Sequence, residues 1–232
     1  MLNFDDFEVL TFDCYGTLID WDSGIWNALQ PILANHHINT SLNKVLEFYG
    51  NLEADAERGP YQEYKMVLQT VLKGLGAQLG FTPTALELQN FSESVKDWLP
   101  FPDTTRSLQA LKKKYKLAII SNIDDNLFAF SADRLQVSFD WVITAKQAKS
   151  YKPSLNNFQL AFDRIGLPKN KILHVAQGLF HDIAPANVLG LSSVWVNRRN
   201  EKPGTGAALP VQAQPDLEVP DLQTLAGKMG LM

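Results

Sequence analysis

The stretch "EVLTFDCYGTLIDWDSG", residues 8–24, sets the architecture of this 232-residue chain. Its apolar run from Val9 to Phe12 has the length of a buried strand, and the run ends on a single acid, Asp13. Gly16 follows three residues later and allows the backbone to turn tightly after the acid. This pattern predicts that Asp13 lies at the carboxyl edge of a parallel sheet, where open α/β proteins bind their ligands.

The rest of the chain alternates between short apolar runs and helical patterns. Four further runs are expected to form strands: "YKLAIIS" (115–121), "FDWVITA" (139–145), "KILHVAQ" (171–177) and "SSVWVN" (192–197). Helical patterns between them predict an α/β fold with a Rossmann-like, doubly wound parallel sheet. The Pro- and Gly-rich stretch 198–220 predicts a surface loop, and a short closing helix is expected from Asp221.

One region interrupts this alternation. No strand pattern is found between Trp21 and Leu99, where four helical stretches fit instead, at about 22–36, 41–57, 61–79 and 83–98. We therefore predict a catalytic core formed by residues 1–20 and 100–232, with a helical-bundle cap, residues 21–99, inserted after the first strand.

Composition narrows the class of protein. Hydrophobic residues make up 45% of the chain, charged residues 20%, and the net charge is −4, which indicates an ordinary globular protein and argues against nucleic-acid binding. No apolar run reaches the roughly 20 residues of a membrane span, and the N-terminus lacks a signal-peptide pattern. Cys14 is the sole cysteine, so no internal disulfide can form, and we expect a cytoplasmic protein.

Polar side chains follow the ends of the predicted strands. They are Asp13 after the first, Ser121 and Asn122 after the second, Lys152 past the third, and Gln177 and Asp182 after the fourth. A carboxylate near a lysine and hydrogen-bond donors has a lowered pKa and stays ionised. Asp13 is therefore a candidate for nucleophilic catalysis through an ester or acyl-phosphate intermediate.

Four segments, "FDCYGTLID", "LAIISN", "KSYKP" and "HVAQGLFHDIAPANVLGL", resemble in order and spacing the four motifs of the haloacid dehalogenase superfamily. The helical insertion also sits where that superfamily carries its cap. The resemblance implies that Asp13 is the nucleophile, that Thr17 and Ser121 bind the reacting group, that Lys152 stabilises charge, and that Asp182 is the carboxylate of the fourth motif.

Tyr15 separates two reactions within this superfamily. The phosphatases carry an aspartate two residues after the nucleophile and bind magnesium, whereas this chain has Tyr15 there and Gln177 in place of an upstream acid of motif four. The D-x-Y-G-T form is similar to the L-2-haloacid dehalogenase branch. That similarity implies a hydrolase that displaces halide from a small 2-haloalkanoic acid through a covalent aspartyl ester, without metal or cofactor, and a homodimer as the assembly.

The chain departs from that branch around the substrate. The branch carries an arginine early in its cap, whereas Arg58 is the only arginine between residues 21 and 99 and lies later. A serine and an asparagine of motif four are replaced by Gln177 and Leu179, and a tyrosine after the lysine is replaced by Phe158. The expected substrate-binding residues are Tyr15, Asn122, Trp21, Arg58 and Gln177.

Two alternatives remain open at this point. One is a magnesium-dependent phosphatase of a small phosphorylated metabolite, which would need Gln177 to serve through its carbonyl and water or another group to replace the missing acid. The other is a non-catalytic binding protein on the same scaffold. EDTA should inhibit only the phosphatase, and Asp13→Asn should change turnover only if the protein is an enzyme.

Overall fold

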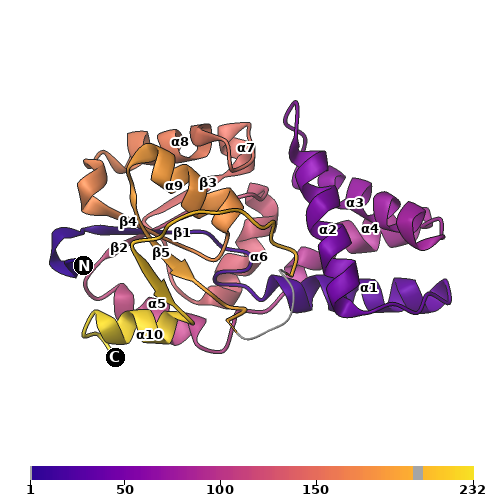
Figure 1. Cartoon of the computed structure of the whole chain (residues 1–232), viewed down its shortest axis with the longest axis horizontal. Coiled ribbons are helices and arrows are strands. Elements are labelled where there is room, and N and C mark those ends of the chain that lie inside the picture. The colour runs from indigo at the N-terminus through magenta and orange to yellow at the C-terminus, as the bar shows by residue number, and fades with distance from the viewer. Residues whose placement is uncertain (1, 201–205) are drawn as a thin grey trace.

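A computed structural model describes residues 2–200 and 206–232 and shows one six-stranded parallel sheet flanked by helices (Figure 1). The strand order is β3-β2-β1-β4-β5-β6. The strands are β1 (Val9–Phe12), β2 (Lys116–Ser121), β3 (Trp141–Thr144), β4 (Ile172–Ala176), β5 (Ser192–Val196) and β6 (Leu217–Val219). The Rossmann-like α/β class predicted from the alternating pattern is confirmed.

The central strand β1 explains why its sequence is almost continuously apolar. Leu10 and Phe12 pack into the larger hydrophobic cluster, and Val9 packs into a second cluster on the opposite face. Helices α5 (Thr104–Leu111), α6 (Asp125–Leu135) and α10 (Leu222–Lys228) contribute to the first cluster, and α8 (Leu155–Ile165) and α9 (Ala184–Leu189) to the second. Since helices cover both faces, every side chain of β1 is buried.

The helical insertion consists of α1 (Trp21–Asn35), α2 (Leu42–Glu57), α3 (Tyr64–Leu79), α4 (Ala85–Glu93) and the 3₁₀ turn η2 (Ser94–Asp97). It stands beside the sheet layers at one end of the molecule (Figure 1). Helix α4 begins later than the sequence pattern suggested because Thr84 and Glu87 form a capping box. The chain leaves and re-enters the core side by side, where Ile19 bridges to Pro100.

The expectation of a surface loop over 198–220 is wrong at its end. Leu217–Val219 forms β6, parallel to β5, with Val196 opposite Val219. A three-residue edge strand between polar and proline-rich segments gives too short an apolar run for detection. Residues 201–205 of this stretch lie outside the described part of the chain. The closing helix begins as expected, with the Asp221 carboxylate accepting a hydrogen bond from Thr224 N at 2.6 Å.

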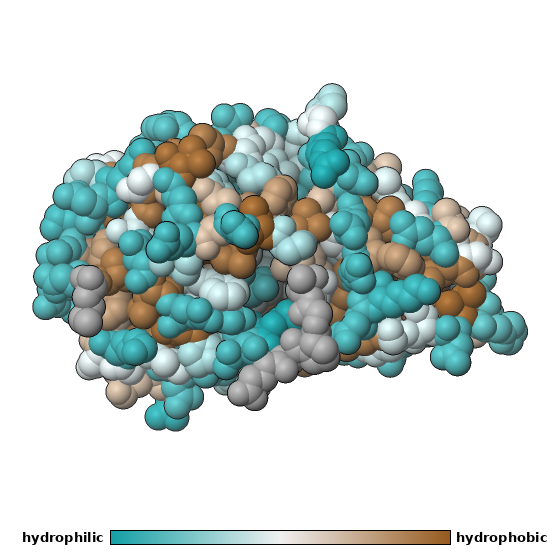
Figure 2. Space-filling view, viewed as in Figure 1, coloured by the Kyte–Doolittle hydropathy of each residue, from teal (hydrophilic) through white to brown (hydrophobic). Residues whose placement is uncertain are grey.

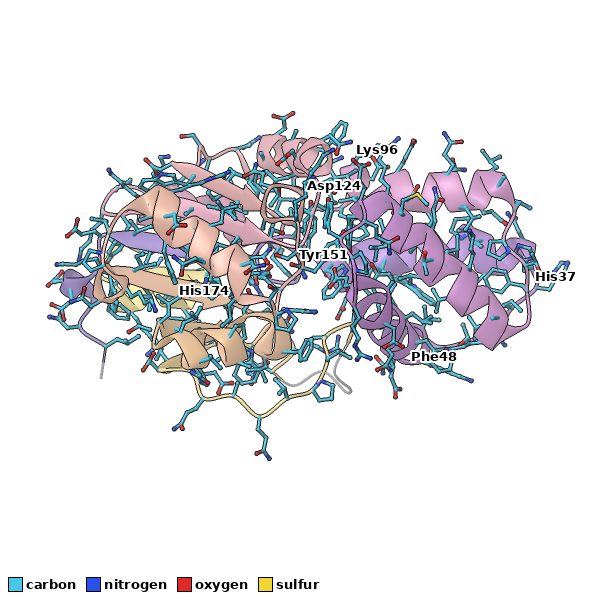
Figure 3. All side chains as sticks on the ribbon, turned by 90° about the horizontal axis from the view of Figure 1, so that it is seen from above. His37, Phe48, Lys96, Asp124, Tyr151 and His174 are labelled. Atoms are coloured by element: carbon cyan, nitrogen blue, oxygen red, sulfur yellow. The ribbon has the colours of Figure 1, made fainter. Side chains whose placement is uncertain are left out.

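Polar and aromatic contacts join the insertion to the core. Tyr151 and Asp124 lie at the junction (Figure 3), where Tyr61 Oη donates to Asp124 at 2.9 Å and Tyr151 Oη donates to the carbonyl of Gln62 at 2.7 Å. His37 lies at the far end of the insertion, away from this junction.

Two short helices complete the core near the strand ends: α7 (Ala145–Ala148) and the π-helical turn η4 (Leu179–Ile183). The 3₁₀ turns η1 (Phe4–Asp6) and η3 (Lys169–Lys171) lie elsewhere on the core. Hydrophilic and hydrophobic residues are mixed over the face shown in Figure 2. Within the described residues, no helix combines the length and apolar character needed to cross a bilayer.

A segment that follows β5 reaches back to the insertion. Ala207 is 2% exposed, and its backbone N–H donates to Asp22 Oδ1 at 3.2 Å. A Cβ atom added at Gly50 of α2 would lie only 2.2 Å from the Ala207 carbonyl oxygen. Gly50 therefore permits a close approach between α2 and a segment of the core, next to the edge where the strands end.

Candidate active site

Asp13 follows β1 directly and is held from both sides. Its side chain is nearly buried, its Oδ1 lies 2.9 Å from Lys152 Nζ, and its Oδ2 accepts a hydrogen bond from Thr17 Oγ1 at 2.7 Å. The Gln177 backbone N–H in turn donates to Thr17 Oγ1 at 2.9 Å. Gly16 has φ +90°, and a Cβ there would lie 3.0 Å from Gln177 Oε1, so glycine satisfies both the turn and the close packing.

Lys152 connects the two acids of the site. Its ammonium group contacts Asp182 Oδ1 at 2.6 Å as well as Asp13, and donates to the carbonyl of Ile120 at 2.7 Å. Burial alone would lower the pKa of Lys152, but the charges of Asp13 and Asp182 outweigh burial and raise it. Lys152 is therefore a fixed positive charge beneath the carboxylates.

The two carboxyl groups differ in their protonation equilibria. Burial raises the pKa of Asp13 above its ordinary value, with Lys152 and Thr17 acting in the opposite direction. The lowered Asp13 pKa expected from the sequence is therefore not found, because the desolvation of a strand-end residue under the insertion was not foreseen. Burial also acts on Asp182, but Lys152 and His174 lower its pKa overall.

A histidine of β4 extends this network into the core. His174 is fully buried, and its Nε2 lies 3.1 Å from Asp182 Oδ1 while its Nδ1 lies 2.9 Å from Thr11 Oγ1. Phe158, expected to differ from the dehalogenase pattern, packs against the His174 ring at a centroid distance of 5.2 Å. Figure 3 shows His174 within the core layers, away from the junction.

A small cavity of about 40 Å³ opens above Asp13. Its lining comes from both the core and the helical insertion: Asp13, Tyr15, Trp21, Glu53, Glu57, Tyr64, Ser121, Asn122, Lys152, Gln177, Gly178, His181, Asp182 and Ala208. The strand-end residues that the sequence singled out are thus brought together at the predicted edge of the sheet.

Asn122 holds the segment that carries Lys152. The Lys152 backbone N–H donates to Asn122 Oδ1 at 2.7 Å, and Asn122 Nδ2 donates to the Lys152 carbonyl at 3.0 Å. Ser121 Oγ is fully buried and has no hydrogen-bond partner among the described residues, so this hydroxyl remains available to a ligand.

Tyr15 forms part of the cavity wall. Its hydroxyl lies 2.8 Å from Ser131 Oγ, and its ring packs edge-on against Trp98 with centroids 5.7 Å apart. Burial raises the pKa of the Tyr15 hydroxyl well above its ordinary value. Tyr15 therefore stays neutral and uses its hydroxyl for a bond away from Asp13.

Arg58 is not brought to the site. It is the residue after α2, 73% of its side chain is exposed, and it pairs with Asp55 at 2.8 Å. The neighbouring Glu57 faces the cavity instead, and the extended backbone at Arg58 directs its side chain elsewhere. The structure therefore gives no support to Arg58 as a substrate-binding residue.

The sequence analysis missed the contribution of α2. Glu53 and Glu57 line the cavity one helical turn apart, on the face of α2 that also buries Tyr49. Acidic residues that continue a buried helical stripe were the available signal, because such residues are rarely buried unless they are paired. Ala208 gave no comparable signal within its proline-rich segment.

Comparison with known proteins agrees with this geometry. A family model described as haloacid dehalogenase-like hydrolase matches residues 7–190. The chain is 26% identical over 209 residues to (S)-2-haloacid dehalogenase 4A of Burkholderia cepacia, covering 86% of this chain and 87% of that protein. It is 27% identical over 237 residues to the (S)-2-haloacid dehalogenase of Pseudomonas sp. (strain YL), covering 97% and 98%.

Solved structures extend the likeness to the fold. The L-2-haloacid dehalogenase of Xanthobacter autotrophicus with chloropropionic acid covalently bound superimposes with a TM-score of 0.79 at 20% identity, covering 97% of this chain and 99% of that one. Since the family match spans most of the chain and includes the segments that carry Asp13, Lys152 and Asp182, this protein belongs to the haloacid dehalogenase-like hydrolases.

Proposed function

We propose that this hydrolase uses Asp13 as a covalent nucleophile, without a metal, to release the 2-substituent of a small carboxylic acid, with 2-haloalkanoic acids as the first substrate class. The observation that carries the proposal is the pairing of Asp13 with Lys152 and Thr17, while Tyr15 stands where a second acid would be. Halide leaves as an anion and needs no proton, so displacement at carbon requires no general acid at Tyr15.

The reaction has two steps. A carboxylate oxygen of Asp13 attacks the carbon that bears the halogen, an oxygen–carbon bond forms, and halide leaves with the bonding electron pair. Water then attacks the carbonyl carbon of the Asp13 ester, which releases a 2-hydroxy acid and regenerates the carboxylate with loss of one proton. Lys152 lies 2.9 Å from Asp13 Oδ1 and stabilises the oxygen on which charge develops during hydrolysis.

The donor set fits magnesium poorly. The Lys152 ammonium group already contacts both Asp13 and Asp182, and Gln177 provides a neutral side chain. Magnesium favours anionic oxygen ligands in an octahedral arrangement. Among the described residues, no group of three or more His, Cys, Asp or Glu side chains is placed to hold a metal ion. The phosphatase alternative therefore has weaker support, and the non-catalytic alternative does not explain the retained Asp13–Lys152 pair.

Chloride release from L-2-chloropropionate, measured with EDTA present, tests the proposal. We expect release by the wild type and none by Asp13→Asn, with Asp6→Asn on the surface as the matched control. A rapid-quench sample of the wild type should show a mass increase on the peptide that contains Asp13. Phosphate release from p-nitrophenyl phosphate that requires magnesium, without halide release, would refute the proposal in favour of the phosphatase.

A further inference from the structure

The insertion side of the cavity presents two carboxyl groups. Glu53 is 3% exposed, and its Oε1 accepts hydrogen bonds from Tyr49 Oη at 3.0 Å and Tyr64 Oη at 2.6 Å. Glu57 has a side chain that is 5% exposed, and its Oε2 accepts a hydrogen bond from Asn122 Nδ2 at 3.1 Å. Their spacing of four residues places both on one face of α2, towards Asp13.

Several polar atoms of the cavity have no partner within the described part of the chain. Glu57 Oε1, Ser121 Oγ and His181 Nε2 are buried and form no hydrogen bond there. Buried polar atoms are costly to leave unsatisfied, and native structures contain few of them. Three such atoms around one cavity leave hydrogen-bonding capacity for the polar groups of a ligand that enters it.

The charges around the cavity favour a particular kind of group. Lys152 supplies a positive charge that already contacts Asp13 and Asp182. Burial lowers the pKa of His181 to about 4, so this histidine is neutral at pH 7. The described cavity residues of the insertion are Trp21, Glu53, Glu57 and Tyr64, none of them a cation. On the insertion side of the cavity, an anionic group of a ligand would lie beside the carboxyl groups of Glu53 and Glu57. A cationic group there would find the oxygen atoms of these carboxyl groups as hydrogen-bond acceptors.

We propose that Glu57 and Glu53 bind an ammonium group of the substrate. This inference rests on the proposed function, in which Asp13 attacks the carbon of the substrate that bears the leaving group. The substrate class is then a short 2-substituted carboxylic acid that also carries an amine, with the reacting carbon beside Asp13 and the ammonium group towards α2. The cavity measures about 40 Å³, which favours a compact ligand.

Proton linkage distinguishes an ammonium site from a site for anions. Burial raises the pKa of Glu57 well above its ordinary value and that of Glu53 to about 7, so both carboxyl groups hold a proton more readily than an exposed glutamate does. The titratable groups that face Glu57 are Glu53 on its own helix and Lys152, His181 and Tyr151 of the core. An entering ammonium group stabilises the carboxylates and releases protons, whereas an anion would retain them.

Calorimetric titration with three unreactive probes tests the inference: propylammonium, propionate and 3-aminopropionate. At pH 7 we expect the wild type to bind both amines about tenfold or more tightly than propionate, as for a charge-assisted hydrogen bond. Titrations in two buffers of different ionisation enthalpy should show proton release. Glu57→Gln should lose the preference, and Glu47→Gln, an exposed position on the same helix, should keep it.

Tighter binding of propionate than of propylammonium would overturn the inference and assign the carboxyl groups as neutral donors to an anion. The inference would also be overturned if neither amine binds, or if Glu57→Gln keeps the preference for amines over propionate. These probes do not react, so the result is independent of ester formation on Asp13. If halide is released, kcat/KM for 3-amino-2-chloropropionate should exceed that for 2-chloropropionate by about tenfold, in line with the binding data.

Discussion

Replacing Lys152 with methionine preserves much of the side-chain length and removes the charge that Asp13 and Asp182 share. The ammonium group lies 2.9 Å and 2.6 Å from the two carboxylates, and only 1% of the Lys152 side chain is exposed. Removing one partner of a buried ion pair typically costs about 3–5 kcal/mol, because an uncompensated charge remains. We expect Lys152→Met to lower the free energy of unfolding by about that amount at pH 8.

The pH dependence provides the sharper part of this prediction. Without Lys152, burial and mutual repulsion raise the pKa of both carboxyl groups above their values in the unfolded chain. The folded variant then binds more protons than the unfolded chain, so its stability falls as the pH rises and is recovered as the pH is lowered. The difference from wild type should therefore shrink markedly at pH 5. Adding Asp13→Asn should restore part of the lost stability at pH 8.

Urea unfolding followed by tryptophan fluorescence measures both effects. The control is Lys146→Met, which removes a surface lysine that pairs with Glu63 at 2.8 Å with both side chains partly exposed. Such pairs contribute little to stability. Two results would refute the reasoning. One is a Lys152→Met variant that is no less stable at pH 8 than the control. The other is a loss of stability that is the same at pH 5 as at pH 8. Either result would mean that Lys152 does not offset the buried charges of Asp13 and Asp182.

Three other substitutions test separate parts of the structure. Burial raises the pKa of Glu53 from 4.5 to about 7, so wild-type stability should fall as the pH rises through this range. Glu53→Gln should reduce that fall by about 3 kcal/mol, measured by urea unfolding between pH 5 and 8. An unchanged dependence of stability on pH would contradict the raised pKa of Glu53. Tyr15→Phe removes the hydrogen bond to Ser131, which should lower the free energy of unfolding by about 1 kcal/mol. The rate of halide release should stay within a few-fold of the wild-type rate. A large fall in kcat would mean that the hydroxyl takes part in the reaction. Gly50→Ala should lower the midpoint of urea unfolding because the added Cβ would overlap the Ala207 carbonyl. This effect should outweigh the gain of about 1 kcal/mol that alanine brings to a helix over glycine. A raised midpoint would show that the Ala207 segment moves away at little cost.

The core was predictable because its signals are local. Each of the strands β1 to β5 is a short apolar run, and parallel strands bring Asp13, Lys152 and Asp182 to one edge by topology alone. The sequence motifs located these residues, and the structure adds the 2.6 Å contact that joins Lys152 to Asp182. The short strand β6 had no such signal, since three residues at a sheet edge do not form a distinctive pattern.

The side of the cavity formed by the insertion was less predictable because it depends on how the insertion packs on the core. Arg58 and Glu57 are adjacent in sequence, yet only Glu57 lines the cavity. Which of the two faces the core is set by the face of α2 that buries Tyr49, and by where the helix ends. The pKa of Asp13 likewise depends on desolvation by distant segments, which a motif cannot report.

The division of the site between two parts of the chain has an evolutionary consequence. Asp13, Lys152 and Asp182 follow strands of the sheet, whereas Glu53 and Glu57 belong to a single helix of the insertion. Substitutions on one turn of α2 can therefore alter the lining of the cavity while Asp13, Lys152 and Asp182 keep their positions.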